Sequence, residues 1–319
     1  MKESPLIRAR RQIRALAGIP ATRGWEKEVT VIVKTFERPA CVAQCLASVR
    51  RHYPSLAVLV CDDGREPLFG EGEEPSPGIL WTTLPYEAGH TLGAGRNHLV
   101  DRVRTPFFFL ADDDHVLGPH TRIDVLHAAL GRHSLDICGG SQGKGDYSFA
   151  VFEEGDGVVR QVFNVYHEEL EPGIVRCDRV PNSFLAGTEA VRRVRWEERV
   201  YAAEHTDFFL RATRAGLRTA LVGYVYVDHD RSCEERSGLL GKLLHRWLPH
   251  SDRSYARQRG GAGQGRSPRE LEEEFVLKKN GVRAIIHVGN RGLRRGLEAR
   301  LGDPYYGRPP TPGAIPPIA

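Results

Sequence analysis

Short apolar runs and amphipathic stretches follow one another along the first part of the chain. Residues 29–34 and 57–61 are apolar and rich in β-branched side chains, which predicts two buried strands. Between these runs, Cys41, Cys45 and Val49 recur at helical spacing, which predicts a helix. A strand, a helix and a second strand make a βαβ unit, so we expect the two strands to be parallel.

The same alternation continues through most of the sequence. It predicts strands at residues 79–84, 106–111, 134–143 and 219–230, helices at residues 93–104, 121–133 and 201–217, and a β-rich region at residues 141–180. Alternating strands and helices of this kind predict an α/β fold. Open sheets in such folds bind ligands at the carboxyl ends of their strands, so residues just after the strands are the first candidates for function.

The composition limits the class of protein. With 319 residues and 40% hydrophobic content, the chain is long enough to form a core. It has no apolar run of about 18 residues and no signal-peptide pattern, so we expect a soluble, cytoplasmic protein. A net charge of +4 is too small to indicate nucleic-acid binding, although arginine-rich segments near both ends suit an acidic partner or a membrane surface.

The six cysteines are spread over the chain without a CxxC pair. Several stand in apolar surroundings, which predicts buried, reduced thiols rather than a disulfide framework. Cys41 and Cys45 lie four residues apart, but two ligands do not make a zinc site.

Three adjacent acids, Asp112, Asp113 and Asp114, follow the apolar run at residues 106–111. Their like charges raise one another's pKa unless a positive group neutralises them. In an extended segment Asp112 and Asp114 point to the same side, and two carboxylates on one side suit a hard divalent cation and the phosphate that it carries. The alternative is a solvated acidic turn after a strand.

Two further segments carry candidate chemistry. His229 follows an apolar strand, and if that strand lies beside the aspartates, its imidazole completes an oxygen and nitrogen ligand set that favours manganese. The commoner role of a single histidine is to cap a turn. Glu204 and Asp207 lie three residues apart on one helical face, which makes a general base one interpretation. The other is an ordinary helix start, where acids interact favourably with the helix dipole.

Several segments, taken together and in order, resemble a known family. They are VTVIVKTFERP, LVCDDGREP, GAGRNHLV, LADDDHV, EHTDFFL and VDHD. The chain resembles the inverting family 2 glycosyltransferases with the GT-A fold, and within them the catalytic domain of the β-1,4-N-acetylgalactosaminyltransferases of the ganglioside GM2 synthase type. The resemblance implies one GT-A domain over residues 29–279, a mixed sheet with helices on both faces. A basic helical segment precedes it at residues 1–28, and an extension with a Pro-rich tail follows at residues 280–319.

The resemblance also implies a nucleotide site. Thr35, Phe36 and Arg38 match the segment that encloses the nucleotide. Asp63 matches the carboxylate that accepts the imide proton of uracil, and Arg96 matches a basic residue near the diphosphate.

The acidic segment matches the metal site of the family. Asp112 and Asp114 match its metal-binding DxD motif, with Asp113 nearer the ribose or the sugar. His229 matches a third metal ligand that some members have.

The implied reaction is the metal-dependent, inverting transfer of a hexose or N-acetylhexosamine from a UDP sugar to a hydroxyl group of a glycan, a lipid-linked acceptor or a small metabolite. Mn²⁺ or Mg²⁺ would neutralise the leaving diphosphate. Asp207 stands where the base of the family stands, and Glu204 is close enough to compete. The alternatives are a nucleotidyltransferase of related architecture, which releases pyrophosphate, and a non-catalytic protein that binds a sugar nucleotide.

Overall fold

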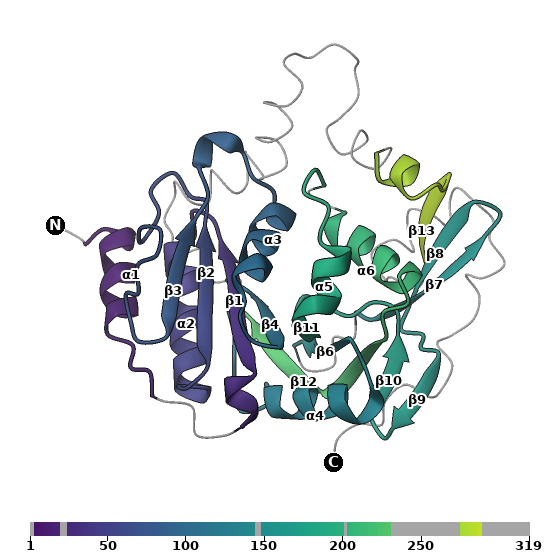
Figure 1. Ribbon diagram of the computed structural model, residues 1–319, viewed down its shortest axis with the longest axis horizontal. Coiled ribbons are helices and arrows are strands. Elements are labelled where there is room, and N and C mark those ends of the chain that lie inside the picture. The colour runs from purple at the N-terminus through teal and green to yellow at the C-terminus, as the bar shows by residue number, and fades with distance from the viewer. Residues whose placement is uncertain (1–2, 20–23, 144–147, 201–202, 231–274, 289–319) are drawn as a thin grey trace, which may run out of the picture.

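The computed structural model describes residues 3–19, 24–143, 148–200, 203–230 and 275–288. Its largest feature is one sheet with the strand order β3-β2-β1-β4-β11-β6-β12-β10-β9 (Figure 1). The first four strands in space are β3 (Ile79–Thr83), β2 (Ala57–Asp62), β1 (Val29–Thr35) and β4 (Phe107–Asp112). These four strands pair with one another in parallel. Helix α2 (Pro39–His52) connects β1 to β2, so the predicted βαβ unit is confirmed.

The other half of the sheet is mostly antiparallel. Its strands are β11 (Phe184–Gly187), β6 (Ile137–Gln142), β12 (Thr219–His229), β10 (Ile174–Cys177) and β9 (Glu168–Glu171), and the short β5 (His115–Val116) pairs with the end of β12. Among these strands only the β6–β12 pairing is parallel. The prediction of a mixed sheet is therefore confirmed.

A second sheet of three strands lies beside the main one. It consists of β7 (Ala150–Gly155), β8 (Val158–Phe163) and β13 (Ala284–Val288), in the order β13-β8-β7. β13 belongs to the extension predicted at residues 280–319, yet it pairs in parallel with β8. The folded structure thus continues beyond residue 279. The Pro-rich tail lies outside the described residues.

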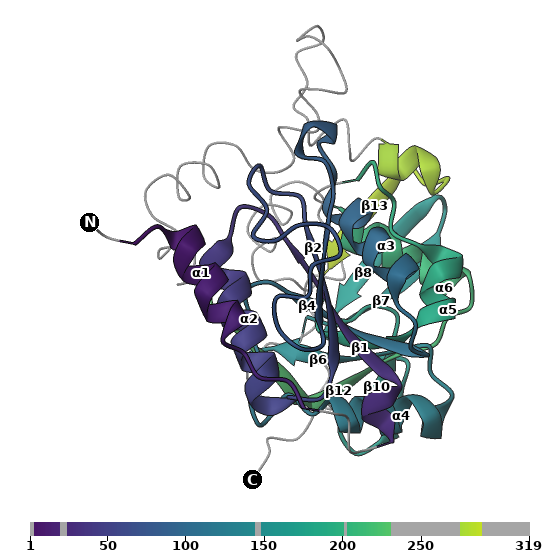
Figure 2. The same ribbon diagram turned by 60° about the vertical axis from the view of Figure 1, so that its left-hand side comes forward.

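Helices cover both faces of the main sheet and enclose two cores. One core contains Ile13 from α1 (Pro5–Arg14), Leu46 from α2 and Leu126 from α4 (Ile123–His133). The other contains Leu99, Val191 and Phe208, which belong to α3 (Leu92–Arg102), α5 (Thr188–Val194) and α6 (Glu204–Arg214). Figure 2 shows α1 and α2 on one side of the sheet and α3, α5 and α6 on the other. Two short 3₁₀ helices, η1 (Trp25–Lys27) and η2 (Tyr86–Ala88), lie in the loops before β1 and before α3.

The loop between β2 and β3 folds back along the outer edge of β3. The N–H of Gly72 donates to the carbonyl of Trp81 at 2.9 Å, and the N–H of Trp81 donates to the carbonyl of Glu73 at 2.8 Å. The carboxylate of Glu71 also accepts from the N–H of Thr83 at 2.6 Å. The backbone groups of Trp81 and Thr83 on the open side of this edge strand are therefore paired with the loop.

The cysteines follow the sequence prediction with one exception. Four are free and buried: Cys45, Cys61, Cys138 and Cys177. Cys41 is disulfide-bonded, so the expectation of a reduced thiol is wrong at that position. Among the described helices, none is both long and apolar enough to span a membrane.

Candidate active site

Four strands bring the candidate residues to one edge of the main sheet. β1, β2 and β4 are parallel neighbours, so their carboxyl ends coincide, and the register places Lys34 beside both Cys61 and Asp112. β12 runs in the same direction, because β11 is antiparallel to both β4 and β6, and β12 is parallel to β6. The end of β12 places His229 opposite His115. This is the edge at which open α/β sheets bind ligands.

Asp113 ties the acidic segment to the loop after β1. Its carboxylate accepts hydrogen bonds from Oγ1 of Thr35 at 2.8 Å and from Nη1 of Arg38 at 2.6 Å. Burial raises the pKa of Asp113 to about 7, against the opposing effect of Arg38. Arg38 also donates to Asp114 at 2.9 Å. Thr35 and Arg38, which were expected to bind the nucleotide, therefore contact the aspartates.

Asp112, Asp114 and His115 each place a ligand atom within 4.8 Å of the others, an arrangement able to hold a metal ion. His115 is a poor ligand in this geometry, because its Nδ1 accepts the backbone N–H of Asp112 at 3.1 Å. Its Nε2 lies 2.9 Å from the side-chain nitrogen of Gln142, so both ring nitrogens already have hydrogen-bond partners. His115 is therefore better suited to holding the turn, and sequence reasoning did not single it out.

His229, the predicted third ligand, contacts Asp114 as well as the ring of His115, whose centroid is 5.7 Å away. Its Nε2 is 3.0 Å from a carboxylate oxygen of Asp114. Burial alone would raise the pKa of Asp114, but this hydrogen bond and the charge of Arg38 outweigh it and hold the pKa well below its ordinary value. In this contact Nε2 of His229 donates, so only Nδ1 of a neutral ring keeps a lone pair for a cation, while Asp112 and Asp114 offer the oxygen donors that suit Mn²⁺ or Mg²⁺. The residues present thus fit a divalent cation.

The part of the site expected to bind the nucleotide contains a buried ion pair that sequence reasoning did not identify. Nζ of Lys34 contacts the carboxylate of Asp63, and both side chains are less than 5% exposed. Phe36 stacks on Tyr86 with ring centroids 6.2 Å apart and planes 10° apart. Nζ of Lys34 lies 5.7 Å from the centroid of Phe36, so Asp63 and Phe36 both contact one cation.

Gly95 makes room for this lysine. A Cβ on Gly95 would lie 2.5 Å from Cδ and Cε of Lys34, which is too close for two carbons. Helix α3 begins at Leu92, and the hydroxyl of Thr91 accepts the N–H of Ala94 at 3.1 Å as its cap. Gly95 of the segment GAGRN therefore allows helix α3 to pack closely against Lys34.

Arg96 connects the aspartates to helix α6. It is fully buried, and its two Nη atoms reach Asp112 at 2.9 Å and Glu204 at 3.1 Å. Burial raises the pKa of Glu204, while the charge of Arg96 lowers it. Asn182 also donates to Asp112 at 3.3 Å. Of the two predicted base candidates, the structure brings Glu204 to the aspartates.

Asp207, the other candidate, points elsewhere. Its side chain is 0% exposed and accepts from Arg211 at 2.7 Å and from Asn280 at 2.9 Å, with Lys279 at 3.3 Å. These contacts join α6 to the segment that leads into β13. Two cations and an amide occupy the carboxylate, which is the environment of a structural ion pair.

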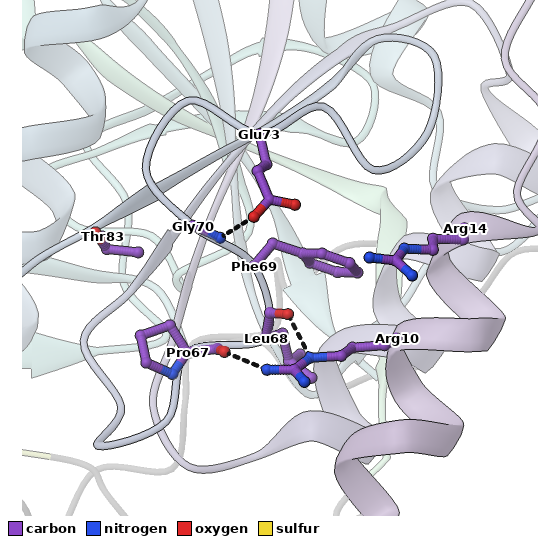
Figure 3. Close-up of a pocket in the computed structure, with 8 residues that line it drawn as sticks. All are labelled: Arg10, Arg14, Pro67, Leu68, Phe69, Gly70, Glu73 and Thr83. Carbon is purple, nitrogen blue, oxygen red and sulfur yellow. Dashed lines mark hydrogen bonds between the residues drawn. The ribbon is translucent and has the colours of Figure 1, made fainter.

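A separate cavity of about 480 Å³ lies between α1 and the loop after β2 (Figure 3). Arg10 donates to the carbonyls of Pro67 at 3.0 Å and Leu68 at 2.6 Å, and the guanidinium of Arg14 lies 5.5 Å from the centroid of Phe69. None of the residues predicted to bind the nucleotide or the metal lines this cavity. Its described contacts attach α1 to the loop.

Comparison with known proteins identifies the family of the chain. Residues 30–200 match the family described as Glycosyl transferase family 2. A mouse β-1,4 N-acetylgalactosaminyltransferase 2 is 34% identical over 210 residues, which is 63% of this chain and 39% of the relative. A human β-1,4 N-acetylgalactosaminyltransferase 1 is 32% identical over 212 residues, 63% of this chain and 38% of the relative. The chain therefore spans about two-fifths of the length of these relatives.

Among solved structures, S. aureus TarS aligns with a TM-score of 0.45 and 15% identity over 68% of this chain and 40% of that one. The α/β fold places the acids at the carboxyl edge of its sheet, where folds of this class bind ligands. The sequence match spans more than half of the chain, and the chain belongs to glycosyltransferase family 2.

Proposed function

We propose that the protein is a metal-dependent transferase that moves a sugar from a UDP sugar to the hydroxyl group of an acceptor, with inversion at the anomeric carbon. One observation carries the proposal. Asp112 takes part at once in the metal-binding group and in the ion pair with Arg96, which in turn holds Glu204. A cation site and a candidate base therefore lie on either side of one arginine.

Asp112, Asp114 and His229 would hold the cation. When bound, a divalent cation supplies Lewis-acid stabilisation of the departing diphosphate, so no protein acid is needed to protonate the leaving group. Arg38 and Arg96 hold the carboxylates in place from two sides. Asp63 and the stacked pair of Phe36 and Tyr86 are the groups that would meet the nucleobase.

Glu204 is the better placed of the two candidates for the base. A general base must accept the proton of the attacking hydroxyl, and burial that raises its pKa towards neutrality increases its basicity. Asp207 is enclosed by Arg211, Lys279 and Asn280 and lies one helical turn further along α6. We therefore assign proton removal to Glu204.

The donor sugar is proposed as a hexose or an N-acetylhexosamine. The names of the relatives support N-acetylgalactosamine among these. The acceptor is proposed to be a glycan, a lipid-linked sugar or a small metabolite that offers a hydroxyl group.

Calorimetry with UDP, in the presence and absence of Mn²⁺, tests the metal dependence directly. We expect Mn²⁺ to strengthen UDP binding in the native protein, and Asp114→Ala to remove that gain. Asp124→Ala is the matched control, because Asp124 is an acid on α4 bonded only locally, to Arg122 at 2.6 Å. UDP affinity that is the same with and without Mn²⁺ in the native protein would contradict the metal assignment.

Product analysis separates the enzyme classes. A panel of UDP sugars incubated with Mn²⁺ should release UDP, by slow hydrolysis or by transfer. Release of pyrophosphate would favour a nucleotidyltransferase, and no turnover with any sugar would favour a binding protein.

A further inference from the structure

Arg179 is a cation without a counterpart in the described part of the chain. It lies between β10 and β11, where two backbone hydrogen bonds with Ala150, each 3.0 Å long, fix its position. Its Nε is buried without a hydrogen-bond partner, and among the described residues the guanidinium forms no ion pair. The side chain lies instead over Phe163, with Cζ 5.2 Å from the ring centroid.

Such a position is unfavourable for a charge. Removing a guanidinium from water costs free energy unless an acid or a hydrogen-bond acceptor replaces the water. Burial lowers the pKa of Arg179 to about 10, although the nearby Glu204 acts in the opposite direction. Glu204 is itself bonded to Arg96 at 3.1 Å. A ligand with a negative charge would compensate the guanidinium.

The next residues supply a second group without a partner. Nε2 of His205 lies 2.8 Å from the carbonyl of Val180. A carbonyl only accepts, so Nε2 carries the proton and Nδ1 is left as an acceptor. That Nδ1 is buried and has no hydrogen-bond partner in the described structure. Burial holds the pKa of His205 well below its ordinary value, so the ring is neutral and suits a hydroxyl donor.

We propose that Arg179 binds an anionic group of a substrate, a carboxylate or a phosphate, beside the start of α6, while Nδ1 of His205 accepts a hydroxyl of the same substrate. The inference rests on the proposed function, because Glu204, the assigned base, stands at the same helix start. The anion belongs either to the acceptor or to the donor diphosphate.

Binding of small sugars tests the site without turnover. Glucuronate, glucose 6-phosphate and neutral glucose would be titrated into the full chain saturated with UDP and Mn²⁺. We expect the two charged sugars to bind at least about tenfold more tightly than glucose, the size of a hydrogen bond to a charged group. Arg179→Gln should abolish this preference, and Arg179→Lys should keep part of it.

Arg176→Gln is the matched control, because Arg176 lies three residues earlier on β10 and is bonded to Glu168 at the surface. This variant should keep the preference. If glucose binds as well as the charged sugars, but Arg179→Gln weakens UDP binding about tenfold, the anion is the donor diphosphate. If neither affinity depends on Arg179, the proposal is wrong.

Two further outcomes concern a variant that does not fold and a protein that binds sugars without transferring them. Should Arg179→Gln fail to fold, competition in the native protein replaces it: inorganic phosphate must displace glucuronate or, where glucuronate binds no better than glucose, weaken UDP binding, and failure of both overturns the proposal. A protein that binds the charged sugars through Arg179 yet never transfers a sugar would contradict the proposed function and leave this site standing.

Discussion

At the scale of single residues, two buried cations connect segments that lie far apart in the sequence. Lys34 on β1 meets Asp63, and Arg96 on α3 meets both Asp112 and Glu204. A buried ion pair contributes little net stability, but loss of one partner leaves an uncompensated charge and is costly. These pairs therefore fix the relative positions of acids whose chemistry depends on them.

Glu204→Gln should lower kcat by about two to four orders of magnitude, the usual worth of general base catalysis, while UDP binding survives. The glutamine keeps a hydrogen bond to Arg96 but cannot take a proton. Asp207→Asn should instead lower stability by on the order of 3 kcal/mol, since it leaves Arg211 and Lys279 without their acid. Steady-state kinetics and urea unfolding of both variants give the comparison.

The opposite outcome is equally clear. If Asp207→Asn folds normally and is inactive while Glu204→Gln is nearly normal, the base is Asp207, as the family resemblance implies. Retention of an α linkage in the product of an α-linked donor, seen by NMR, would rule out inversion for either residue.

Lys34→Met should destabilise the protein by about 3–5 kcal/mol, because it leaves the carboxylate of Asp63 buried and unpaired. The double variant Lys34→Met with Asp63→Asn should recover much of this loss, since no charge remains buried. Urea unfolding of the single and double variants measures both quantities. A double variant no more stable than Lys34→Met would show that the lysine acts mainly by packing against Gly95.

At the scale of elements, the loop after β2 depends on Asp62. Its carboxylate accepts the N–H groups of Gly64 at 3.0 Å and Leu68 at 2.9 Å. The carbonyl of the same Leu68 accepts a hydrogen bond from Arg10 on α1. The backbone of this one residue therefore connects the end of β2 to the N-terminal helix. Burial raises the pKa of Asp62 to about 6 despite these bonds.

This shift predicts a pH dependence of stability. Between the ordinary pKa near 4 and the folded value of about 6, the folded state binds more protons than the unfolded chain, so the contribution of Asp62 to stability falls as pH rises. The total is about 3 kcal/mol for a shift of roughly two units. Asp62→Asn should remove this part of the slope.

Urea unfolding at pH 4.5 and pH 7 checks the expectation in the native protein and the variant. Asp124→Asn is the control, because the hydrogen bond from Arg122 lowers the pKa of that half-buried acid, so it titrates below this window. A slope unchanged by Asp62→Asn would mean that other buried acids, such as Asp113, carry the dependence.

The elements that the sequence predicts best are those with a strong single periodicity. The β-branched run of β1 favours a strand, and the helical spacing of apolar residues in α2 favours a helix. By contrast, β11 and α5 follow one another within residues 184–194 with only Gly187 at their boundary, and β13 is a short strand after a charged segment. Their structure depends on tertiary partners, which a local pattern does not contain.

The site shows the same division. The acids at the end of β4 were predicted because they follow an apolar strand. Which acid faces which cation could not be predicted, since it depends on the directions of side chains on different strands. Lys34 was open to prediction, because a lysine inside a wholly buried strand needs a buried acid nearby. His115 and Arg179 carry no such signal, since their importance comes from the atoms around them.

At the scale of the whole molecule, the folded region is wider than the predicted domain at residues 29–279. Truncation after Lys279 removes β13 and Asn280, which bonds Asp207 and accepts from Arg214 at 2.8 Å. We expect the melting temperature to fall by roughly 5 °C or more. Truncation after Gly302 removes mainly the Pro-rich tail, which lacks apolar periodicity, and should leave the melting temperature unchanged. Equal melting temperatures for the two truncations would show that β13 is dispensable.

The loop that folds back on β3 has a consequence for how copies of this molecule meet one another. A sheet that ends in an open strand offers a row of N–H and C=O groups on which a second chain can add as a further strand. Here Gly72 and Glu73 already occupy the outward backbone groups of Trp81, and Glu71 takes that of Thr83. The loop blocks the addition of a further strand at that edge. Deletions that shorten the loop would therefore first reduce the solubility of the protein rather than its catalysis.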